Sequence, residues 1–215
     1  MKALTKLSLL LTLFLSAGVF AQPSLYVAGT HYDVLDKPVR TADPNKIEVT
    51  EVFWYGCPHC YAFEPLLNSW VSNLPTDVAF QRSPGMWNSL MEIHAQIYYV
   101  EQALGVYERM HSKVFDEIHQ KHDYLQTEQE IKTFFVANGV DPAEFDKAWS
   151  SFAVTSGVKK ANSRMSEYGI QSVPTLIVNG KYRITVGGAV RTHDDMLKVA
   201  DYLIAMERKG LSKKS

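Results

Sequence analysis

The pattern of hydrophobic and polar positions is strand-like near the N-terminal end of the chain. Apolar side chains alternate with polar ones over residues 45–55, which predicts a strand with Glu51 on its apolar face. Apolar residues then recur every three or four positions over residues 58–74, which predicts a helix, and residues 78–83 form a second β-like run. This order of strand, helix and strand predicts a crossover unit.

A long helical region follows the predicted crossover unit. From residue 87 to about residue 164 the apolar spacing is almost continuously helical. Asp141 and Pro142 have the residue types of a helix N-cap and a first helical position. The pattern breaks near Gly105, His122-Asp123, Gly139 and Asp141-Pro142.

Strand character returns in the last quarter of the chain. Two runs rich in β-forming residues, 173–178 and 182–186, flank Asn179-Gly180, a pair typical of a tight hairpin turn. A last helix is predicted from residue 193 to about residue 208, capped by Thr192. Strands and helices in this order place the chain in the α/β class.

The first 21 residues have the features of a targeting segment. Lys2 and Lys6 precede an apolar run of about 14 residues, too short for the roughly 20 that a membrane-spanning helix needs. Val19-Phe20-Ala21 places small residues at the positions that signal peptidases require, so cleavage is expected before Gln22. The alternative is an uncleaved anchor. We therefore predict a signal peptide at 1–21 and export of the chain.

Length and charge set further limits. Removing 21 of the 215 residues leaves 194, enough for one α/β domain, in two parts at 22–86 and 165–215, with a helical insertion at 87–164. Removal of two lysines also leaves 20 basic residues against 23 acidic ones. A chain with this balance of basic and acidic residues lacks the excess positive charge that is typical of nucleic-acid-binding proteins.

The chain has only two cysteines, Cys57 and Cys60, and both lie in one four-residue motif. A structural disulfide that closes so short a loop would constrain the unfolded chain very little, so we interpret the pair as redox reagents. Structural zinc normally needs four ligands, and no second cysteine pair exists, so no metal is expected. Covalent c-type haem would need histidine after Cys60, where Tyr61 stands.

The position of Cys57 at a helix start predicts an acidic thiol. Unpaired N–H groups, the positive end of the helix dipole and protonated His59 all favour the Cys57 thiolate, and Pro58 suits the first helical turn. Cys60 is expected to be less accessible and closer to an ordinary thiol. Cys57 would then be the attacked sulfur and Cys60 the resolving one. A low pKa at Cys57 stabilises the dithiol, so the disulfide is predicted to be an oxidant and a donor.

Glu51 is the candidate for proton transfer. It shares a predicted face with apolar residues, so we expect it to be buried rather than a solvated strand residue. A buried carboxylate with a raised pKa is suited to relay the proton of Cys60. A basic partner in the second strand falls on Arg82 only if no gap intervenes, and the sequence leaves this open.

These motifs together resemble the thioredoxin fold with an inserted all-helical subdomain. With Cys57-Pro58-His59-Cys60, a later Val173-Pro174-Thr175 and the signal peptide, the chain resembles the DsbA family of periplasmic thiol:disulfide oxidases of Gram-negative bacteria. The resemblance implies that Cys57 is the nucleophile and Cys60 the resolving cysteine, that His59 stabilises the thiolate, and that Glu51 is the buried acid. It also implies that Pro174 is a cis-proline beside the disulfide and that Val173 pairs with an extended substrate. The alternative for Pro174 is an ordinary trans turn proline.

The resemblance also implies partners and a compartment. We expect a monomeric periplasmic oxidase without a bound cofactor, whose clients are unfolded exported proteins and whose disulfide is restored by the quinone-linked membrane protein DsbB. A reductase or isomerase would share the motif, but the usual isomerases carry an N-terminal dimerisation domain, for which the 25 or so residues after Gln22 leave no room. A chaperone-like binding protein with incidental cysteines is the alternative from another class.

Overall fold

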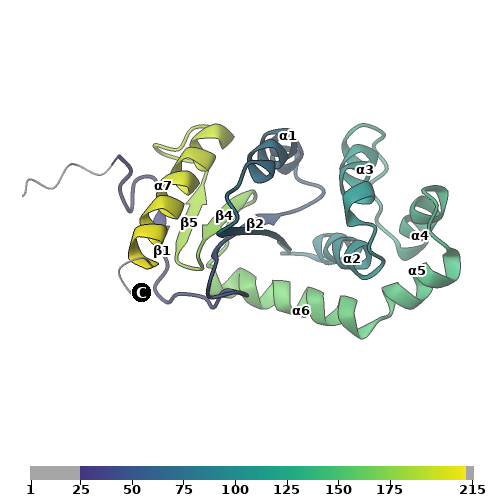
Figure 1. The fold of residues 1–215 in the computed structure, drawn as a ribbon. Coiled ribbons are helices and arrows are strands. Elements are labelled where there is room, and N and C mark those ends of the chain that lie inside the picture. The colour runs from purple at the N-terminus through teal and green to yellow at the C-terminus, as the bar shows by residue number, and fades with distance from the viewer. Residues whose placement is uncertain (1–24, 212–215) are drawn as a thin grey trace, which may run out of the picture.

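A five-stranded mixed sheet forms the centre of the α/β part of the molecule (Figure 1). The computed structural model describes residues 25–211, so the predicted signal peptide at 1–21 lies outside the described residues. The strands lie in the order β1-β5-β4-β2-β3, where β2 and β3 are parallel and every other neighbouring pair is antiparallel. Their bounds are β1 Asp33–Val34, β2 Ile47–Phe53, β3 Val78–Pro84, β4 Thr175–Val178 and β5 Tyr182–Thr185.

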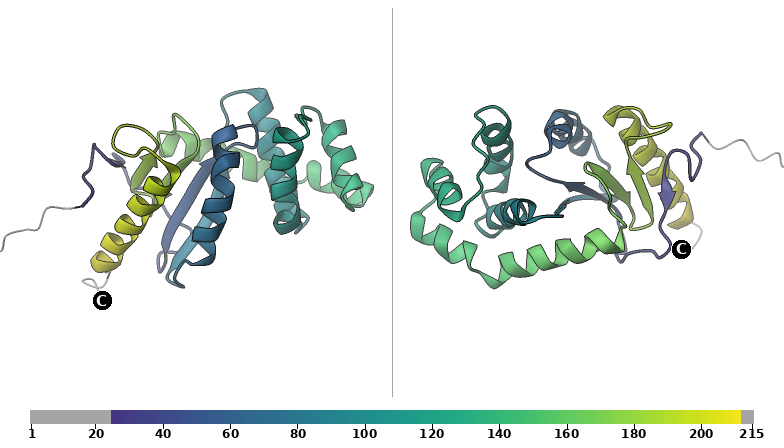
Figure 2. Two further views of the ribbon diagram at one scale, coloured as in Figure 1. Left: turned by 90° about the horizontal axis from the view of Figure 1, so that it is seen from above. Right: turned by 180° about the vertical axis from the view of Figure 1, so that it is seen from behind.

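Helices cover both faces of this sheet. α1 (Pro58–Ser72) and α7 (His193–Leu211) lie on one face, and the C-terminal part of α6 (Phe152–Glu167) lies against the other (Figures 1 and 2). From there α6 runs out along the remaining helices. These are α2 Ser89–Ala103, α3 Tyr107–His119, α4 Glu128–Ala137 and α5 Pro142–Trp149.

Strand β2 is buried along its whole length, because both of its faces are covered. Ile47 and Val49 pack with apolar residues of α1 and α7, whereas Val52 on the opposite face packs with Met165 of α6. The alternating side chains of β2 therefore enter two different apolar cores, one on each face of the sheet, and neither face of the strand is left to solvent. Glu51 lies on the side of α1 and is 0% exposed, which confirms the prediction that it is buried.

The helical region divides into separate helices at the turn residues found in the sequence, except at one break that the sequence did not predict. Asp141 caps α5 by accepting hydrogen bonds from the N–H groups of Ala143 and Glu144, as predicted. The prediction missed the break between α5 and α6 at Ser150-Ser151. No glycine or proline marks it, and Ser151 acts as the N-cap of α6 through the N–H of Val154.

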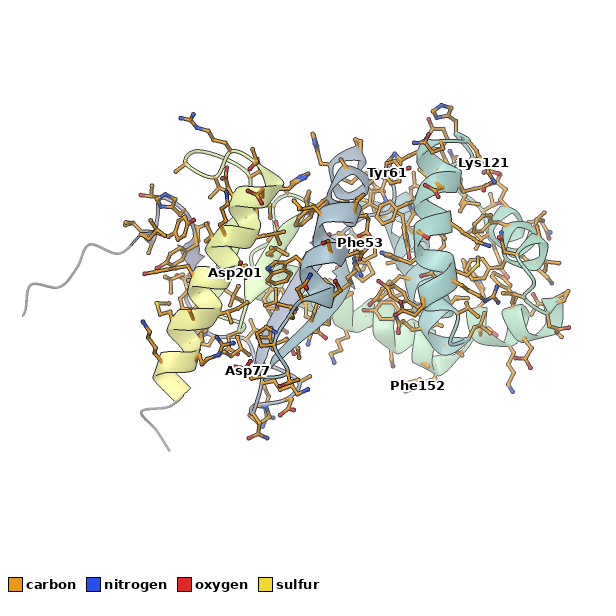
Figure 3. All side chains as sticks on the ribbon, turned by 45° about the horizontal axis from the view of Figure 1, so that its top comes forward. Phe53, Tyr61, Asp77, Lys121, Phe152 and Asp201 are labelled. Carbon is orange, nitrogen blue, oxygen red and sulfur yellow. The ribbon has the colours of Figure 1, made fainter. Side chains whose placement is uncertain are left out.

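The helical region is joined to the end of the sheet by a shared core. Phe53 at the end of β2 packs in one cluster with Phe115 and other residues of α3. Tyr61 extends from α1 toward α3, where its ring stacks on His119 with centroids 4.8 Å apart and its hydroxyl donates to Asp116 at 2.8 Å (Figure 3). The first turns of α1 are therefore held between the sheet and the helical region.

The β4–β5 hairpin has the predicted turn but a later start. Sheet pairing begins at Thr175, so Val173 and Pro174 lie in the preceding loop rather than in the strand. Asn179 and Gly180 have φ values of 51° and 62°, the left-handed conformations that a tight hairpin turn with two central residues requires. A Cβ on Gly180 would lie 2.0 Å from the carbonyl oxygen of Val39, so this turn also needs glycine for space.

Substitution of this glycine tests the packing of the hairpin turn. We expect Gly180→Ala to lower the free energy of unfolding by about 2 kcal/mol or more, because the methyl group meets backbone that cannot move aside. Gly210→Ala, in α7 with open space around it, is the control and should change stability by less than about 0.5 kcal/mol. Urea unfolding of both variants measures the difference, and equal stabilities would contradict the assigned turn.

Candidate active site

The two cysteines lie at the junction of β2 and α1, and both are unbridged thiols in this structure. Cys57 is the N-cap of α1, with extended backbone angles, and Pro58 occupies the first helical position. The Cys57 sulfur accepts a hydrogen bond from the backbone N–H of Cys60 at 3.4 Å. A sulfur in this position satisfies one of the helix N–H groups that lack a partner within the helix.

Cys57 has an acidic thiol, as predicted, although the chief cause is different. Its pKa is lowered to about 6, first by a hydrogen bond from the Cys60 thiol and then by the backbone N–H groups of Cys60 and His59. Burial opposes this shift, and the charge of the exposed His59 makes the smallest contribution. From the sequence, His59 and the helix end were expected to lower this pKa, and the Cys60 thiol was not predicted as a donor.

Cys60 is not an ordinary thiol, which corrects the expectation. It is 0% exposed, against 6% for Cys57, and burial raises its pKa well above the usual value. The Cys57 sulfur and the carboxylate of Glu51 raise it further. Cys60 is less accessible than Cys57, as expected, but its burial raises its pKa more than was predicted from the sequence.

The loop before β4 faces the cysteines. The peptide bond between Val173 and Pro174 is cis, and the carbonyl oxygen of Val173 lies 3.5 Å from the Cys57 sulfur. Pro174 is buried and Val173 is half-buried. Because pairing in the sheet starts at Thr175, the backbone of Val173 is not used by the strands.

Glu51 forms a buried ion pair within the electrostatic influence of Cys60. β2 and β3 pair with Glu51 opposite Arg82, so the question left open by the sequence is answered, and Arg82 Nε donates to Glu51 Oε2 at 2.8 Å. Burial raises the pKa of Glu51 to about 7, and Arg82 only partly offsets this effect. Glu51 Oε1 has no hydrogen-bond partner among the described residues. Near neutral pH this carboxyl group exists in both protonation states.

The ion pair belongs to a larger buried network that the sequence did not reveal. Arg82 also donates to Glu64 of α1 at 3.0 Å, and His111 of α3 lies 3.5 Å from the same carboxylate. Burial disfavours charge on His111, but hydrogen bonds to Glu101 and Glu64 outweigh it and raise the pKa of His111. The Tyr55 hydroxyl joins the network, 2.7 Å from Glu101 and 2.6 Å from His111. These residues lie far apart in the chain, so spacing alone could not have paired them.

Other kinds of site are not seen in the part of the chain that the structure describes. Between residues 25 and 211, no group of three or more His, Cys, Asp or Glu side chains is arranged to hold a metal ion. Over the same residues, no helix is both long enough and apolar enough to cross a membrane.

A cavity of about 870 Å³ lies beside α1 and β3 and is lined in part by Glu64, Arg82 and His111 of the buried network.

Comparisons with known proteins agree on one family. Residues 76–197 match the family model described as a DSBA-like thioredoxin domain. The thiol:disulfide interchange protein DsbA of Pseudomonas aeruginosa is 42% identical over 196 residues, which cover 91% of this chain and 92% of that protein. DsbA of Azotobacter vinelandii is 44% identical over 180 residues, 84% of each chain. The crystal structure of Pseudomonas aeruginosa DsbA superimposes with a TM-score of 0.83, covering 87% of this chain and 97% of that one.

Replacing Cys60 tests the origin of the acidic thiol at Cys57. In the reduced wild type, thiolate absorbance at 240 nm should titrate with a midpoint near the pKa of about 6 assigned to Cys57. We expect Cys60→Ala to raise this midpoint by about one unit, because the side-chain donor is lost. Cys60→Ser keeps a hydroxyl donor and should raise it less. A midpoint in Cys60→Ala equal to that of the wild type would assign the shift to the helix end alone.

Proposed function

Because the chain belongs to the DsbA family of thiol:disulfide oxidoreductases, we propose that it donates the Cys57–Cys60 disulfide to newly exported proteins. The observation that carries this direction is the position of the Cys57 sulfur at the N-cap of α1. A thiolate there is stabilised, and each pKa unit below ambient pH raises the reduction potential by roughly 30 mV. The disulfide is therefore the less stable state and tends to be passed on.

The exchange needs two attacks on sulfur. A thiolate of the client attacks the Cys57 sulfur, the bond between Cys57 and Cys60 breaks, and Cys60 leaves with the electron pair. The second client thiolate then attacks the client sulfur of the mixed disulfide, and Cys57 leaves as a thiolate. The client gains one disulfide and the protein becomes the dithiol, so thiols and electrons balance. The low pKa of Cys57 makes it the better leaving group in the second attack.

The first attack needs a proton for Cys60, whose own pKa is high. Glu51 is the proposed source, because it is buried within the electrostatic influence of Cys60 and has a pKa of about 7. The protonated carboxyl group can neutralise the departing Cys60 sulfur, and the carboxylate can remove that proton when the protein is reoxidised. Arg82 holds the carboxyl group in place at 2.8 Å.

Val173 and Pro174 are the proposed docking loop for the client. The Val173 carbonyl faces the Cys57 sulfur at 3.5 Å, and the backbone of Val173 is not used by the sheet. An extended client segment can pair with this backbone as an added strand, which would bring its cysteine beside Cys57. Such binding uses main-chain groups and so suits clients of many sequences.

The remaining parts of the proposal concern place and partners. We infer that residues 1–21 direct export to the periplasm, that the mature protein is a monomer, and that a membrane protein of the DsbB type restores the disulfide. The relatives named DsbA support the activity and this setting. No cofactor besides the disulfide is required by the two sulfur attacks.

The reduction potential and a serine variant test the proposed direction. Equilibration with glutathione should give a potential clearly above the roughly −270 mV of thioredoxin, and the oxidised protein should form disulfides in a reduced, unfolded client. Cys57→Ser should abolish this turnover. A potential near that of thioredoxin would favour a reductase, and client binding that survives Cys57→Ser without any turnover in the wild type would favour a chaperone.

Glu51→Gln tests the proton relay. We expect the Gln variant to release glutathione from the Cys57 mixed disulfide at least about tenfold more slowly at pH 8, because Cys60 has lost its base. At pH 6, where Glu51 in the wild type is mostly protonated, the two rates should converge. Stopped-flow measurements between these pH values check this. A constant ratio across the range would exclude a relay through Glu51.

A further inference from the structure

The backbone of Trp54 acts on both cysteines. Its carbonyl oxygen accepts a hydrogen bond from the N–H of Cys57 at 3.0 Å. Its own backbone N–H faces the Cys60 thiol and acts to lower the pKa of that thiol. The position of this one peptide segment therefore affects the orientation of Cys57 and the ionisation of Cys60.

The Trp54 side chain is fixed in turn by α2. The indole lies across Gly56, where a Cβ atom would come within 2.3 Å of the ring. The indole Nε1 donates a hydrogen bond to Nδ1 of His94 at 2.9 Å, and the two rings stack with an angle of 29° between their planes. Glycine at position 56 thus allows the indole to reach back over the loop toward His94.

His94 is held at its other nitrogen as well. It is 1% exposed, and its Nε2 lies 2.9 Å from the backbone carbonyl of Tyr124, in the segment between α3 and α4. Because Nδ1 accepts from the indole, Nε2 carries the hydrogen and donates it to that carbonyl. Burial lowers the pKa of His94, which keeps the imidazole neutral and this arrangement of donor and acceptor intact.

We propose that His94 is a positioning residue for the redox pair: it holds the indole of Trp54 and so fixes the backbone that contacts Cys57 and Cys60. The connection runs from the helical region, through the imidazole and indole, to the first turn of α1. This inference rests on the proposed redox role of the two cysteines and adds a residue that touches neither of them. A histidine that only filled the core would contribute to stability alone.

Substitutions at His94 separate these two roles. His94→Phe keeps an aromatic ring but neither hydrogen bond, and we expect the equilibrium constant for oxidising glutathione to fall about threefold, equivalent to a rise of half a unit in the Cys57 pKa. The reason is that a looser Trp54 carbonyl lets the N-cap turn relax and weakens the N–H bonds to the Cys57 sulfur. His94→Asn places an amide oxygen near the Nδ1 position, so it should restore most of the constant although stability stays low.

A double-mutant cycle tests whether the effect passes through the indole. Trp54→Phe should cause a similar fall of about threefold, and His94→Phe should then have no further effect in that background. Trp70→Phe is the matched control, because it removes an indole that donates to Asp201, away from the cysteines, and should leave the constant unchanged. Should His94→Phe fail to fold, the comparison of Trp54→Phe with Trp70→Phe and with His94→Asn still decides the question.

Two results would overturn the proposal. The first is an unchanged glutathione constant in His94→Phe, with only the midpoint of urea unfolding lowered. The second is an equal effect of His94→Phe in the wild-type and Trp54→Phe backgrounds. Failure of the redox proposal itself is distinguishable, since it would appear in the wild-type protein as a potential near that of thioredoxin.

Discussion

The hydrogen bonds that converge on the sulfur of Cys57 are the interaction on which the site depends. They exist because β2 ends one turn before α1 begins, so a thiol stands where serine or aspartate usually caps a helix. The donors are His59 and Cys60, both within the next three residues, so the geometry is local and needs only a well-formed first turn. The surrounding fold serves to hold that turn still and to leave Val173 facing it.

The helical region does more than shield the active site from solvent: it also supplies polar partners for the buried charged groups. Burying Glu51 and Glu64 would be costly without partners, and the sheet supplies Arg82 to both carboxylates. His111, from α3, supplies a second basic group, and Tyr55 ties it to Glu101 of α2. Because these groups come from β2, β3, α1, α2 and α3, the network joins the helical region to the sheet through ionic and polar contacts as well as apolar ones. A carboxyl group at Glu51 that titrates near neutral pH is a product of this shared burial.

Much of the fold could be predicted because its signals are local. The start of α1 and the Asn179-Gly180 turn each depend on a few adjacent residues, and the structure has both, whereas β2 ends at Phe53, two residues before the predicted end. The break at Ser150-Ser151 was missed because serine caps leave a weaker mark than glycine or proline. The contacts of Trp54 with His94 and of Tyr55 with Glu101 join residues 40 and 46 positions apart, and a single sequence has no pattern that pairs them.

The two cysteines carry the same thiol group and lie only three residues apart, but their different positions in the helix give the two thiols different pKa values. Cys57 receives hydrogen bonds at the helix start and becomes acidic, whereas Cys60, one turn further in, loses contact with water and lies within the electrostatic influence of Glu51. The same hydrogen bond between the two thiols lowers the pKa of Cys57 and raises that of Cys60. Each cysteine therefore stabilises the protonation state of the other. A thiolate at Cys57 favours the protonated form of Cys60, and the Cys60 proton favours the charged form of Cys57. Forming the disulfide removes this mutual stabilisation, which is the physical reason that the pair favours the dithiol and passes its bond to another protein.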